Sequence, residues 1–376
     1  DLSKYVAHRP SVLYWVMQPG ADVGGIGMGL VRMIRPWNEW LIVWGYDINE
    51  PAPEVTPEFA TGVARQLVGD PELEIELLSA NTWTVNDAFA TSLQKGRVFI
   101  MGDAAHRHPP SNGLGSNTSI QDSFNLAWKL TAVLKGHAGQ ALLDTYSDER
   151  APIAKQIVTR ANQSIGEFGP IFQALGMTGG TDIELIKQNM DARCDAGPDA
   201  EAQRAALRDA IEFKKYEFDA HGVEMNQRYR STAVVTDGQM EPAFDLDAEL
   251  HFQPTTWPGA RLPHTWIFRE SNGDKVSTLD LCGHGQFTLF TGIGGEAWRE
   301  AATQVGADLG MAINVHVIGP RQEYVDHVGD WARANEVSDT GCILVRPDHH
   351  VAWRADELSE DPKSELARVM NTILAR

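Results

Sequence analysis

Cysteine is scarce in this sequence of 376 residues. The three cysteines, Cys194, Cys282 and Cys342, are odd in number and far apart in the chain. Small secreted proteins depend on paired cysteines for their disulfides, so no disulfide framework is expected here. The sequence therefore predicts free thiols and a cytoplasmic location.

Positive charge and long hydrophobic runs are scarce as well. Lys and Arg together number 32 and Asp and Glu 51, which gives a formal net charge of −19. Nucleic acids and anionic membrane surfaces attract clustered cations, so the acidic excess argues against both as partners. No apolar run reaches the roughly 18 residues that a membrane-spanning helix needs. An enzyme of small neutral or phenolic ligands is compatible with these absences.

Tryptophan, in contrast, is abundant and concentrates near the start of the chain. Trp40 and Trp44 belong to an apolar run in which the period of two of a strand places them on one face. They either wall a pocket for an aromatic substrate or form part of the core of a sheet. The expected elements are strands over residues 11–17, 24–34 and 40–46, in a twisted antiparallel sheet, and a helix over 56–68.

The character of the chain changes twice, which predicts three parts. After Gly96 a short apolar run over residues 97–101 is typical of a buried parallel strand, and helical patterns follow it. From Asp237 onward the chain is first rich in proline and then alternates short strands with helices, as in a small α/β domain. We therefore expect domains over residues 1–95, 96–236 and 237–376.

Two helices of the middle part have apolar stripes. The first is expected over residues 118–134, with Thr118 and Gln121 at the spacing of a capping box. The second is expected over residues 152–168, where Gly169-Pro170 would end it. The stripe expected to face the core in the first helix consists of Ile120, Phe124, Ala127, Leu130 and Leu134.

The stretch over residues 102–117 joins the expected strand to the expected helix. Asp103 follows the strand directly, where α/β sheets bind ligands, and its carboxylate can accept hydrogen bonds from sugar-type hydroxyls. Gly113 and Gly115 allow close backbone approach, and Ser116 and Asn117 lie at a helix start, which favours negative charge. These features suit a flavin, whose reduced form is negative at its pyrimidine edge. From spacing alone, a plain connecting loop is an equal alternative.

The same stretch resembles the second FAD-binding motif of the single-component flavoprotein aromatic hydroxylases. Several C-terminal segments are similar to the phenol-hydroxylase branch of that family, which ends in a thioredoxin-like domain. The segments that carry the resemblance are residues 102–106, Pro109-Pro110, Gly113, Gly115, Asn117 and Asp122, and residues 125–130, 146–152, 259–264 and 345–354.

The resemblance implies a fold and an activity. The fold is α/β with α+β character: a mixed or antiparallel substrate sheet, part of an FAD-binding domain and a thioredoxin-like C-terminal domain. The cofactor is FAD, the co-substrate is NADPH, and a flavin C4a-hydroperoxide formed with O2 hydroxylates a phenol or chlorophenol at the ortho carbon to give a catechol. A homodimer or higher homo-oligomer is also implied.

The resemblance also assigns residues. Asp103 would contact the ribityl chain of FAD, Pro109 and Pro110 would line the flavin and the substrate, and the backbone of residues 115–117 would meet the pyrimidine edge. The predicted cofactor-binding residues are Gly102, Asp103, Pro110, Gly113, Gly115, Ser116 and Asn117, and the predicted substrate-binding residues are Trp40, Trp44 and Pro109. No catalytic residue is assigned. His106 and His108 lack a third ligand at metal spacing, so no metal site is expected.

One part of the family pattern is missing. The chain begins with Asp1 and has no strand followed by G-x-G-x-x-G, the motif that binds the ADP part of FAD. The expectation is an N-terminally truncated chain, whose missing part would also supply any residue that deprotonates the phenol. Two other interpretations stay open: a non-catalytic binding module, and a hydroxylase of larger polycyclic phenols.

Overall fold

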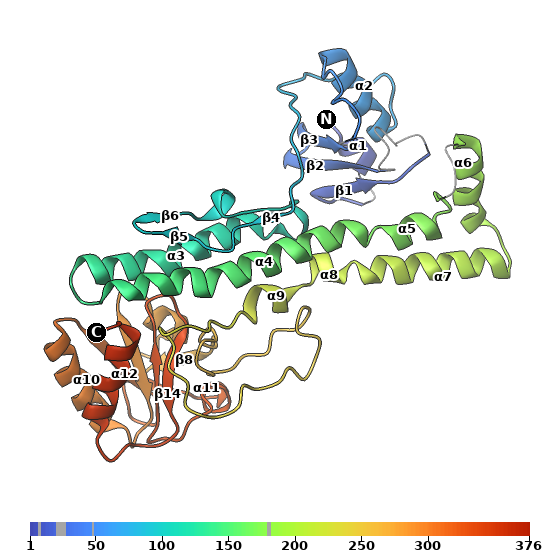
Figure 1. Cartoon of the computed structure of the whole chain (residues 1–376). Coiled ribbons are helices and arrows are strands. Elements are labelled where there is room, and N and C mark those ends of the chain that lie inside the picture. The colour runs from blue at the N-terminus through green and yellow to red at the C-terminus, as the bar shows by residue number, and fades with distance from the viewer. Residues whose placement is uncertain (7–8, 20–27, 47–48, 179–181) are drawn as a thin grey trace. The chain divides into compact units, whose positions relative to one another are not determined.

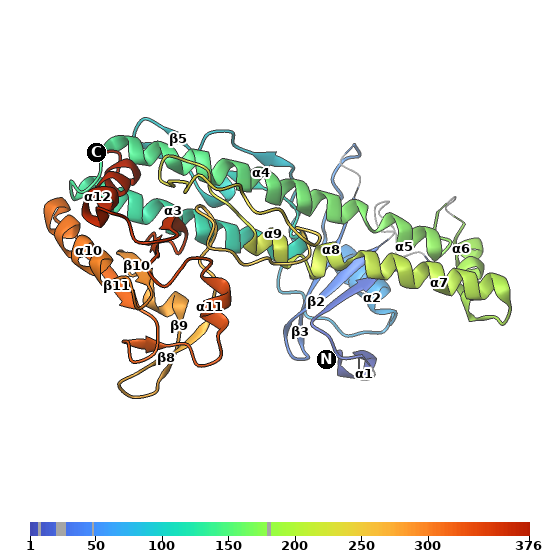
Figure 2. The same ribbon diagram turned by 90° about the horizontal axis from the view of Figure 1, so that it is seen from below.

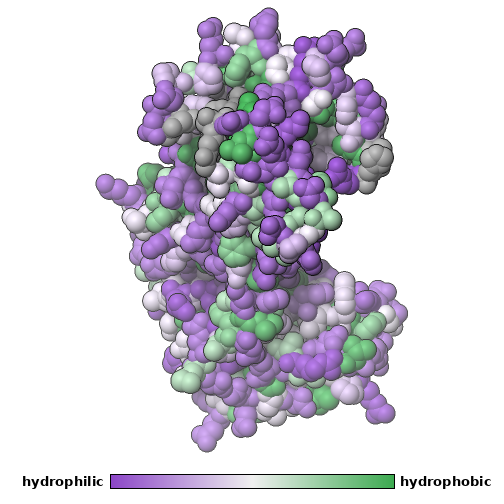
Figure 3. Space-filling model, turned by 90° about the vertical axis from the view of Figure 1, so that its right-hand side faces the viewer, coloured by the Kyte–Doolittle hydropathy of each residue, from purple (hydrophilic) through white to green (hydrophobic). Residues whose placement is uncertain are grey.

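The computed structural model describes residues 1–6, 9–19, 28–46, 49–178 and 182–376. The chain divides into two compact units, each of which is described by itself. The first comprises Asp1–Val85 and Gly166–Lys214, and the second comprises Asn86–Ile165 and Lys215–Arg376. Over the described residues, no helix combines the length and the apolarity needed to cross a membrane. The face shown in Figure 3 is largely hydrophilic, with hydrophobic side chains in small separate patches.

The first unit contains the expected antiparallel sheet. Its strands are β1 (Leu13–Val16), β2 (Gly29–Arg35) and β3 (Glu39–Trp44), in the order β1-β2-β3. The prediction is confirmed for β1 and β3, whereas residues 24–27 of the strand expected over 24–34 lie outside the described residues. A short helix, α1 (Ser3–Val6), precedes the sheet.

The helix expected over residues 56–68 is confirmed as α2 (Pro57–Val68). The Thr56 side chain caps it by accepting a hydrogen bond from the Phe59 N–H, at 3.1 Å, and Pro57 occupies the first helical position. Val63 and Leu67 of α2 are buried against the sheet residue Val31. The apolar stripe of the helix and one face of the sheet thus form a shared core.

Three more helices complete the first unit: α5 (Gly169–Ala174), α6 (Ile183–Asp191) and α7 (Pro198–Phe213). The helix expected over residues 152–168 ends at Gly166, near its expected end, although it begins earlier, at Asp144, and Gly169-Pro170 begins α5. Proline suits the first turn of a helix, where its missing N–H would have had no partner. The rings of Trp15 and Phe168 lie 4.6 Å apart, so strand β1 packs against these helices.

Two long helices, α3 (Gly115–Leu134) and α4 (Asp144–Gly166), run side by side in the second unit (Figures 1 and 2). The expected start at Thr118 is wrong, because Thr118 lies within α3, is buried and donates its backbone N–H to Leu114 O. The expected inward stripe of α3 is also wrong, since Ile120, Phe124 and Leu134 are exposed. The buried face instead carries Thr118, Asp122, Asn125, Leu126, Trp128, Lys129 and Ala132.

The run over residues 97–101 does not form the expected buried parallel strand in the described structure. Gly96, with φ of 61°, turns the chain back, so that β6 (Val98–Phe99) pairs antiparallel with β5 (Gln94–Lys95). Val98 is 67% exposed. A second short pair, β4 (Ala88–Phe89) and β7 (His106–Arg107), is also antiparallel and frames the turn between residues 100 and 106.

The C-terminal part has the expected strands and helices. One sheet has the order β11-β10-β13-β14, in which β10 and β11 are parallel and the other pairs are antiparallel. A β-α-β unit followed by a hairpin and a helix in this order is thioredoxin-like topology, and α10 and α12 lie next to each other beside this sheet (Figure 1). The elements are β10 (Phe287–Thr291), α10 (Glu296–Leu309), β11 (Ile313–Val317), β13 (Cys342–Val345), β14 (Val351–Ala355) and α12 (Pro362–Ile373).

Smaller elements connect these parts. The remaining helices are α8 (Lys215–Phe218), α9 (His221–Met225) and α11 (Asp330–Ala334), and a second small sheet contains β8 (Trp266–Arg269), β9 (Lys275–Ser277) and β12 (Tyr324–Val325). All three cysteines are free. Burial raises the pKa of the Cys282 and Cys342 thiols well above the usual value, so neither is a reactive thiolate at neutral pH.

Candidate functional site

The turn that follows β6 places Asp103 on the surface of the second unit. Gly102 has φ of 57°, and a Cβ at this position would lie 3.0 Å from Ser119 Oγ, so the position favours glycine on two grounds. The backbone N–H of Gly102 donates a hydrogen bond to Asp122 Oδ2 of α3, at 3.1 Å. Asp103 itself is exposed, and its carboxylate has no hydrogen bond or ion pair with the described residues.

The start of α3 presents backbone N–H groups without a capping side chain. Leu114 is the N-cap residue, and the first turn of the helix contains no acidic residue. Asn112 and Gly113, with φ of 64° and 66°, turn the chain into the helix, and Asn117 Nδ2 donates to Gly113 O at 2.9 Å. The first N–H groups of a helix lack intrahelical acceptors, so this end of α3 is suited to an acceptor of negative charge.

His106 and the exposed Arg107 form β7, and His108 follows directly after this strand. His106 is buried, and its Nε2 donates to Asp122 Oδ2 at 2.9 Å. His108 is half-buried; its Nδ1 lies 2.6 Å from Pro109 O, and burial lowers the pKa of its imidazole. Among the described residues, no group of three His, Cys, Asp or Glu side chains has the arrangement of a metal site.

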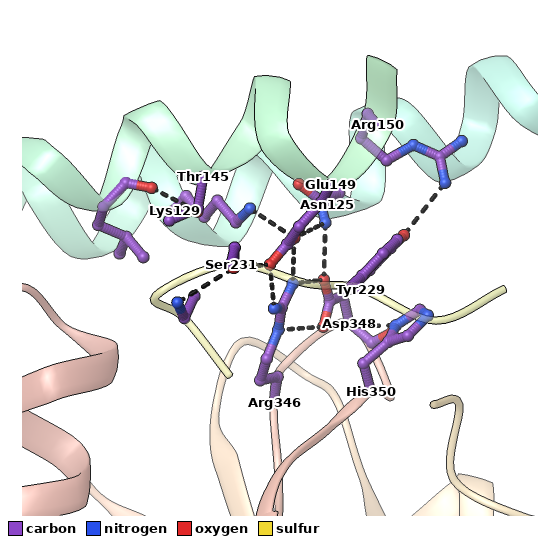
Figure 4. Close-up of polar contacts among 12 residues, drawn as sticks. Asn125, Lys129, Thr145, Glu149, Arg150, Tyr229, Ser231, Arg346, Asp348 and His350 are labelled. Atoms are coloured by element: carbon purple, nitrogen blue, oxygen red, sulfur yellow. Dashed lines mark hydrogen bonds and ion pairs between the residues drawn. The ribbon is translucent and has the colours of Figure 1, made fainter. Parts of the chain in front are cut away.

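A buried network of charged groups joins α3 and α4 to the C-terminal part (Figure 4). At its centre Glu149 of α4 accepts two hydrogen bonds from Arg346, at 2.6 and 2.8 Å, and one from Lys129 Nζ, at 2.7 Å. Arg346 also donates to both oxygens of Asp348, at 3.0 and 2.6 Å. Asn125, Trp128 and Ser231 complete the set of donors to the two carboxylates.

The electrostatics of this network keep its acids ionised. Burial alone would raise the pKa of Glu149, but Arg346 and Lys129 hold it well below the usual range. Arg346 does the same for the pKa of Asp348. Burial lowers the pKa of Lys129 to about 8 despite its carboxylate neighbour. The fully buried charges are thus balanced by partners of opposite sign, as buried ions require.

Arg150, the residue next to Glu149, reaches a different partner. Its Nε donates to Asp122 Oδ1 at 2.7 Å, and its Nη1 donates to Tyr229 Oη at 3.1 Å. Burial alone would raise the pKa of Asp122, but the hydrogen bond from His106 and the charge of Arg150 lower it. The Tyr229 ring is stacked on His350, with centroids 4.0 Å apart.

No site role was predicted for these network residues, although Asp122 and the segments 125–130, 146–152 and 345–354 carry the family resemblance. The recurrence of Asp122, Asn125 and Lys129 at helical spacing, as a polar stripe, was a further signal. The structure brings the predicted residues 102–117 together on one loop and helix start of the second unit. Their contact with a cofactor stays a prediction.

The predicted substrate residues Trp40 and Trp44 lie in the first unit, on β3. Both are half-buried; Trp40 Nε1 donates to Trp37 O at 2.7 Å, and the Trp44 and Phe59 rings lie 5.8 Å apart. The two tryptophans pack with Ile42 against the α2 side of the sheet. Their part in substrate binding stays a prediction.

Comparisons with known proteins agree with this architecture. Residues 1–161 match the model of an FAD binding domain, and residues 255–376 match that of the aromatic-ring hydroxylase C-terminal domain. A 2,4-dichlorophenol 6-monooxygenase of Cupriavidus pinatubonensis is 56% identical over 376 residues, which are 100% of this chain and 63% of the relative. A phenol 2-monooxygenase of a Pseudomonas species is 52% identical over 340 residues, which are 90% of this chain and 56% of the relative.

Solved structures of flavin-dependent monooxygenases also match this chain. The crystal structure of the flavin-dependent monooxygenase PieE in complex with FAD and substrate matches with a TM-score of 0.89 and 43% sequence identity. The match covers 100% of this chain and 64% of that one. The chain therefore spans less than two thirds of the length of these relatives.

Proposed function

We propose that the chain belongs to the family of FAD-dependent aromatic-ring hydroxylases and that the protein hydroxylates chlorinated phenols at the ortho carbon, with FAD, NADPH and O2. The observation that carries the proposal is the 56% identity to a 2,4-dichlorophenol 6-monooxygenase, which extends over all 376 residues. The 52% identity to a phenol 2-monooxygenase supports the same class of substrate.

The residues present fit a flavin. An exposed carboxylate without a described partner, that of Asp103, suits the hydroxyls of a ribityl chain, and the uncapped start of α3 suits a negatively charged ring edge. When bound, FAD would supply the redox chemistry, accepting electrons from NADPH and activating O2 for transfer of one oxygen atom. The protein would contribute binding, orientation and the exclusion of water.

We assign the roles of this chain accordingly. Asp103 would accept hydrogen bonds from the ribityl hydroxyls, and the backbone N–H groups of Ser116 and Asn117 would stabilise negative charge at the flavin edge. Pro109 and Pro110 would line the space shared by flavin and substrate. We also propose that Trp40 and Trp44 wall the substrate pocket. The proposed domain boundaries lie after residues 95 and 236.

The test uses the full-length protein with bound FAD and a panel of phenols. We expect a yellow protein that consumes NADPH faster when a chlorophenol is present, and a catechol as the product in mass spectrometry. A protein that binds FAD but forms no catechol from any phenol would overturn the proposal. Faster turnover of polycyclic phenols would favour the second candidate, which the 36% identity to a tetracenomycin A2 monooxygenase-dioxygenase of Streptomyces glaucescens supports.

A homo-oligomer and a cytoplasmic location complete the proposal. Sedimentation of the purified protein tests the first, and fractionation of the producing cells tests the second. A monomer or a membrane-associated protein would contradict them without affecting the proposed reaction.

A further inference from the structure

Asp122 contacts the candidate flavin turn at two points, one on each side of Asp103. Its Oδ2 accepts hydrogen bonds from the Gly102 N–H, at 3.1 Å, and from His106 Nε2, at 2.9 Å. The side chain is fully buried in α3, whereas Asp103 is exposed. The turn that carries the exposed carboxylate is therefore fastened to the helix by a second, buried carboxylate.

Arg150 in turn fixes Asp122. Its Nε donates to the other carboxylate oxygen, Oδ1, at 2.7 Å. The remaining N–H groups of the guanidinium donate to Tyr229 Oη, at 3.1 Å, and to Thr118 O, at 3.3 Å. Arg150 is itself fully buried, so the planar guanidinium is held in one orientation by acceptors from α3 and from the segment around residue 229.

We propose that Asp122 and Arg150 are positioning residues, which hold the turn from Gly102 to His106 in the conformation that presents Asp103 to the cofactor. This inference rests on the proposed flavin site. It concerns the residues behind that site, none of which is proposed to touch the flavin.

The reason for such an anchor lies in the turn itself. Gly102 has φ of 57° and, as a glycine, many accessible conformations when it is not restrained. A flavin that bound a mobile Asp103 would have to order the turn at the moment of binding, which weakens the affinity. Because the buried Asp122 carboxylate already holds the turn, the turn becomes ordered when the protein folds and not when the flavin binds.

The first test is Asp122→Asn in the full-length protein. The asparagine can accept with one oxygen only, so its NH2 group must face either the Gly102 N–H or the Arg150 guanidinium, both of which are donors. We expect amide exchange over residues 100–106 to become at least about tenfold faster and the dissociation constant of FAD to rise by about tenfold or more. FAD fluorescence quenching measures the second quantity.

Glu149→Gln is the matched control. It also removes one buried carboxylate charge from the same two-helix layer, but its partners are Arg346 and Lys129 and not the turn. We expect a loss of thermal stability comparable to that of Asp122→Asn, with amide exchange over residues 100–106 and FAD affinity unchanged from the wild type.

Each outcome tests whether Asp122 and Arg150 position the turn from Gly102 to His106. Unchanged exchange and unchanged FAD affinity in Asp122→Asn would overturn the proposal, and so would an equal loss of affinity in Glu149→Gln. If Asp122→Asn fails to fold, Tyr229→Phe removes only one acceptor of Arg150 and should raise the dissociation constant of FAD by about threefold. A wild-type protein that binds no FAD would refute the proposed function, but the exchange of the turn would still test the anchor.

Discussion

The buried pair of Glu149 and Arg346 allows a quantitative prediction about stability. Replacing Arg346 by Met keeps much of the volume of the side chain but removes the cation. Four hydrogen bonds are lost, two to Glu149 and two to Asp348, all between groups that are almost fully excluded from water. Glu149 then keeps Lys129 as its cationic partner, at 2.7 Å, and the imidazole of His350 lies 3.7 Å from Asp348 Oδ1.

The expected effect is large. Removing one partner of a buried ion pair costs about 3–5 kcal/mol, because the other charge stays buried without compensation. For a cooperative unit of this size that corresponds to a fall in melting temperature of roughly 10 °C. The exposed pair of Arg333 and Asp330 provides the control, since Arg333→Met should change the free energy of unfolding by less than about 1 kcal/mol.

The pH dependence follows from the same contacts. Folding lowers the pKa of Glu149 and Asp348, so their contribution to stability is present above their unfolded pKa values and is lost as the pH falls through the folded values. Without Arg346, protonation of the carboxyls relieves the uncompensated charge. The difference in stability between Arg346→Met and the wild type should therefore narrow towards acid pH.

Urea unfolding followed by circular dichroism measures both effects. The reasoning is refuted if Arg346→Met unfolds within about 1 kcal/mol of the wild type at neutral pH. It is also refuted if the difference between the two proteins widens as the pH is lowered.

Three further predictions concern the candidate flavin turn. Gly102→Ala should destabilise the protein by about 1–2 kcal/mol in urea unfolding, because φ is 57° and the new Cβ lies 3.0 Å from Ser119 Oγ; a variant as stable as the wild type would contradict this. Asp103→Ala should change stability by less than about 0.5 kcal/mol, since the side chain is exposed, yet weaken FAD binding by about tenfold in a fluorescence titration; equal FAD affinity would remove Asp103 from the site. Tyr146→Phe should lower the free energy of unfolding by about 1 kcal/mol, because the hydroxyl donates to the backbone oxygen of the half-buried Ile100, just before the turn, at 2.9 Å, and a neutral effect would argue against that hydrogen bond.

The elements of the C-terminal part could be predicted from the sequence because their signals are local. The strand Cys342–Val345 is a continuous apolar run and is buried at every position, and the helix Glu296–Leu309 buries an apolar stripe that includes Trp298, Val305 and Leu309. In both, hydrophobicity and burial coincide, so periodicity gives the right face. Asp103, in contrast, lies in a short 3₁₀ turn after β6 and not directly after the buried parallel strand that the local pattern predicted.

The buried face of α3 could not be predicted from the same rules. Hydrophobic periodicity predicts that Asp122 and Lys129 face solvent. Their partners, Arg150 and Glu149, lie on a different helix, outside the stretch of sequence in which periodicity is read. A charge is buried only when a partner of opposite sign and sufficient hydrogen bonds compensate its desolvation. That compensation depends on long-range packing, which a window of sequence does not contain.

The consecutive residues Glu149 and Arg150 connect the two sides of this layer. Side chains of neighbouring residues on an α-helix point about 100° apart, so two consecutive residues can contact two different parts of the structure. Glu149 binds Arg346 in the turn between β13 and β14, and Arg150 binds Asp122, which fastens the turn of Asp103. Tyr229 lies between them, hydrogen-bonded to Arg150 and stacked on His350. The thioredoxin-like part therefore contributes Arg346 and Asp348 to the buried network on one side of α4, whereas Arg150 on the other side holds Asp122 and with it the candidate flavin turn.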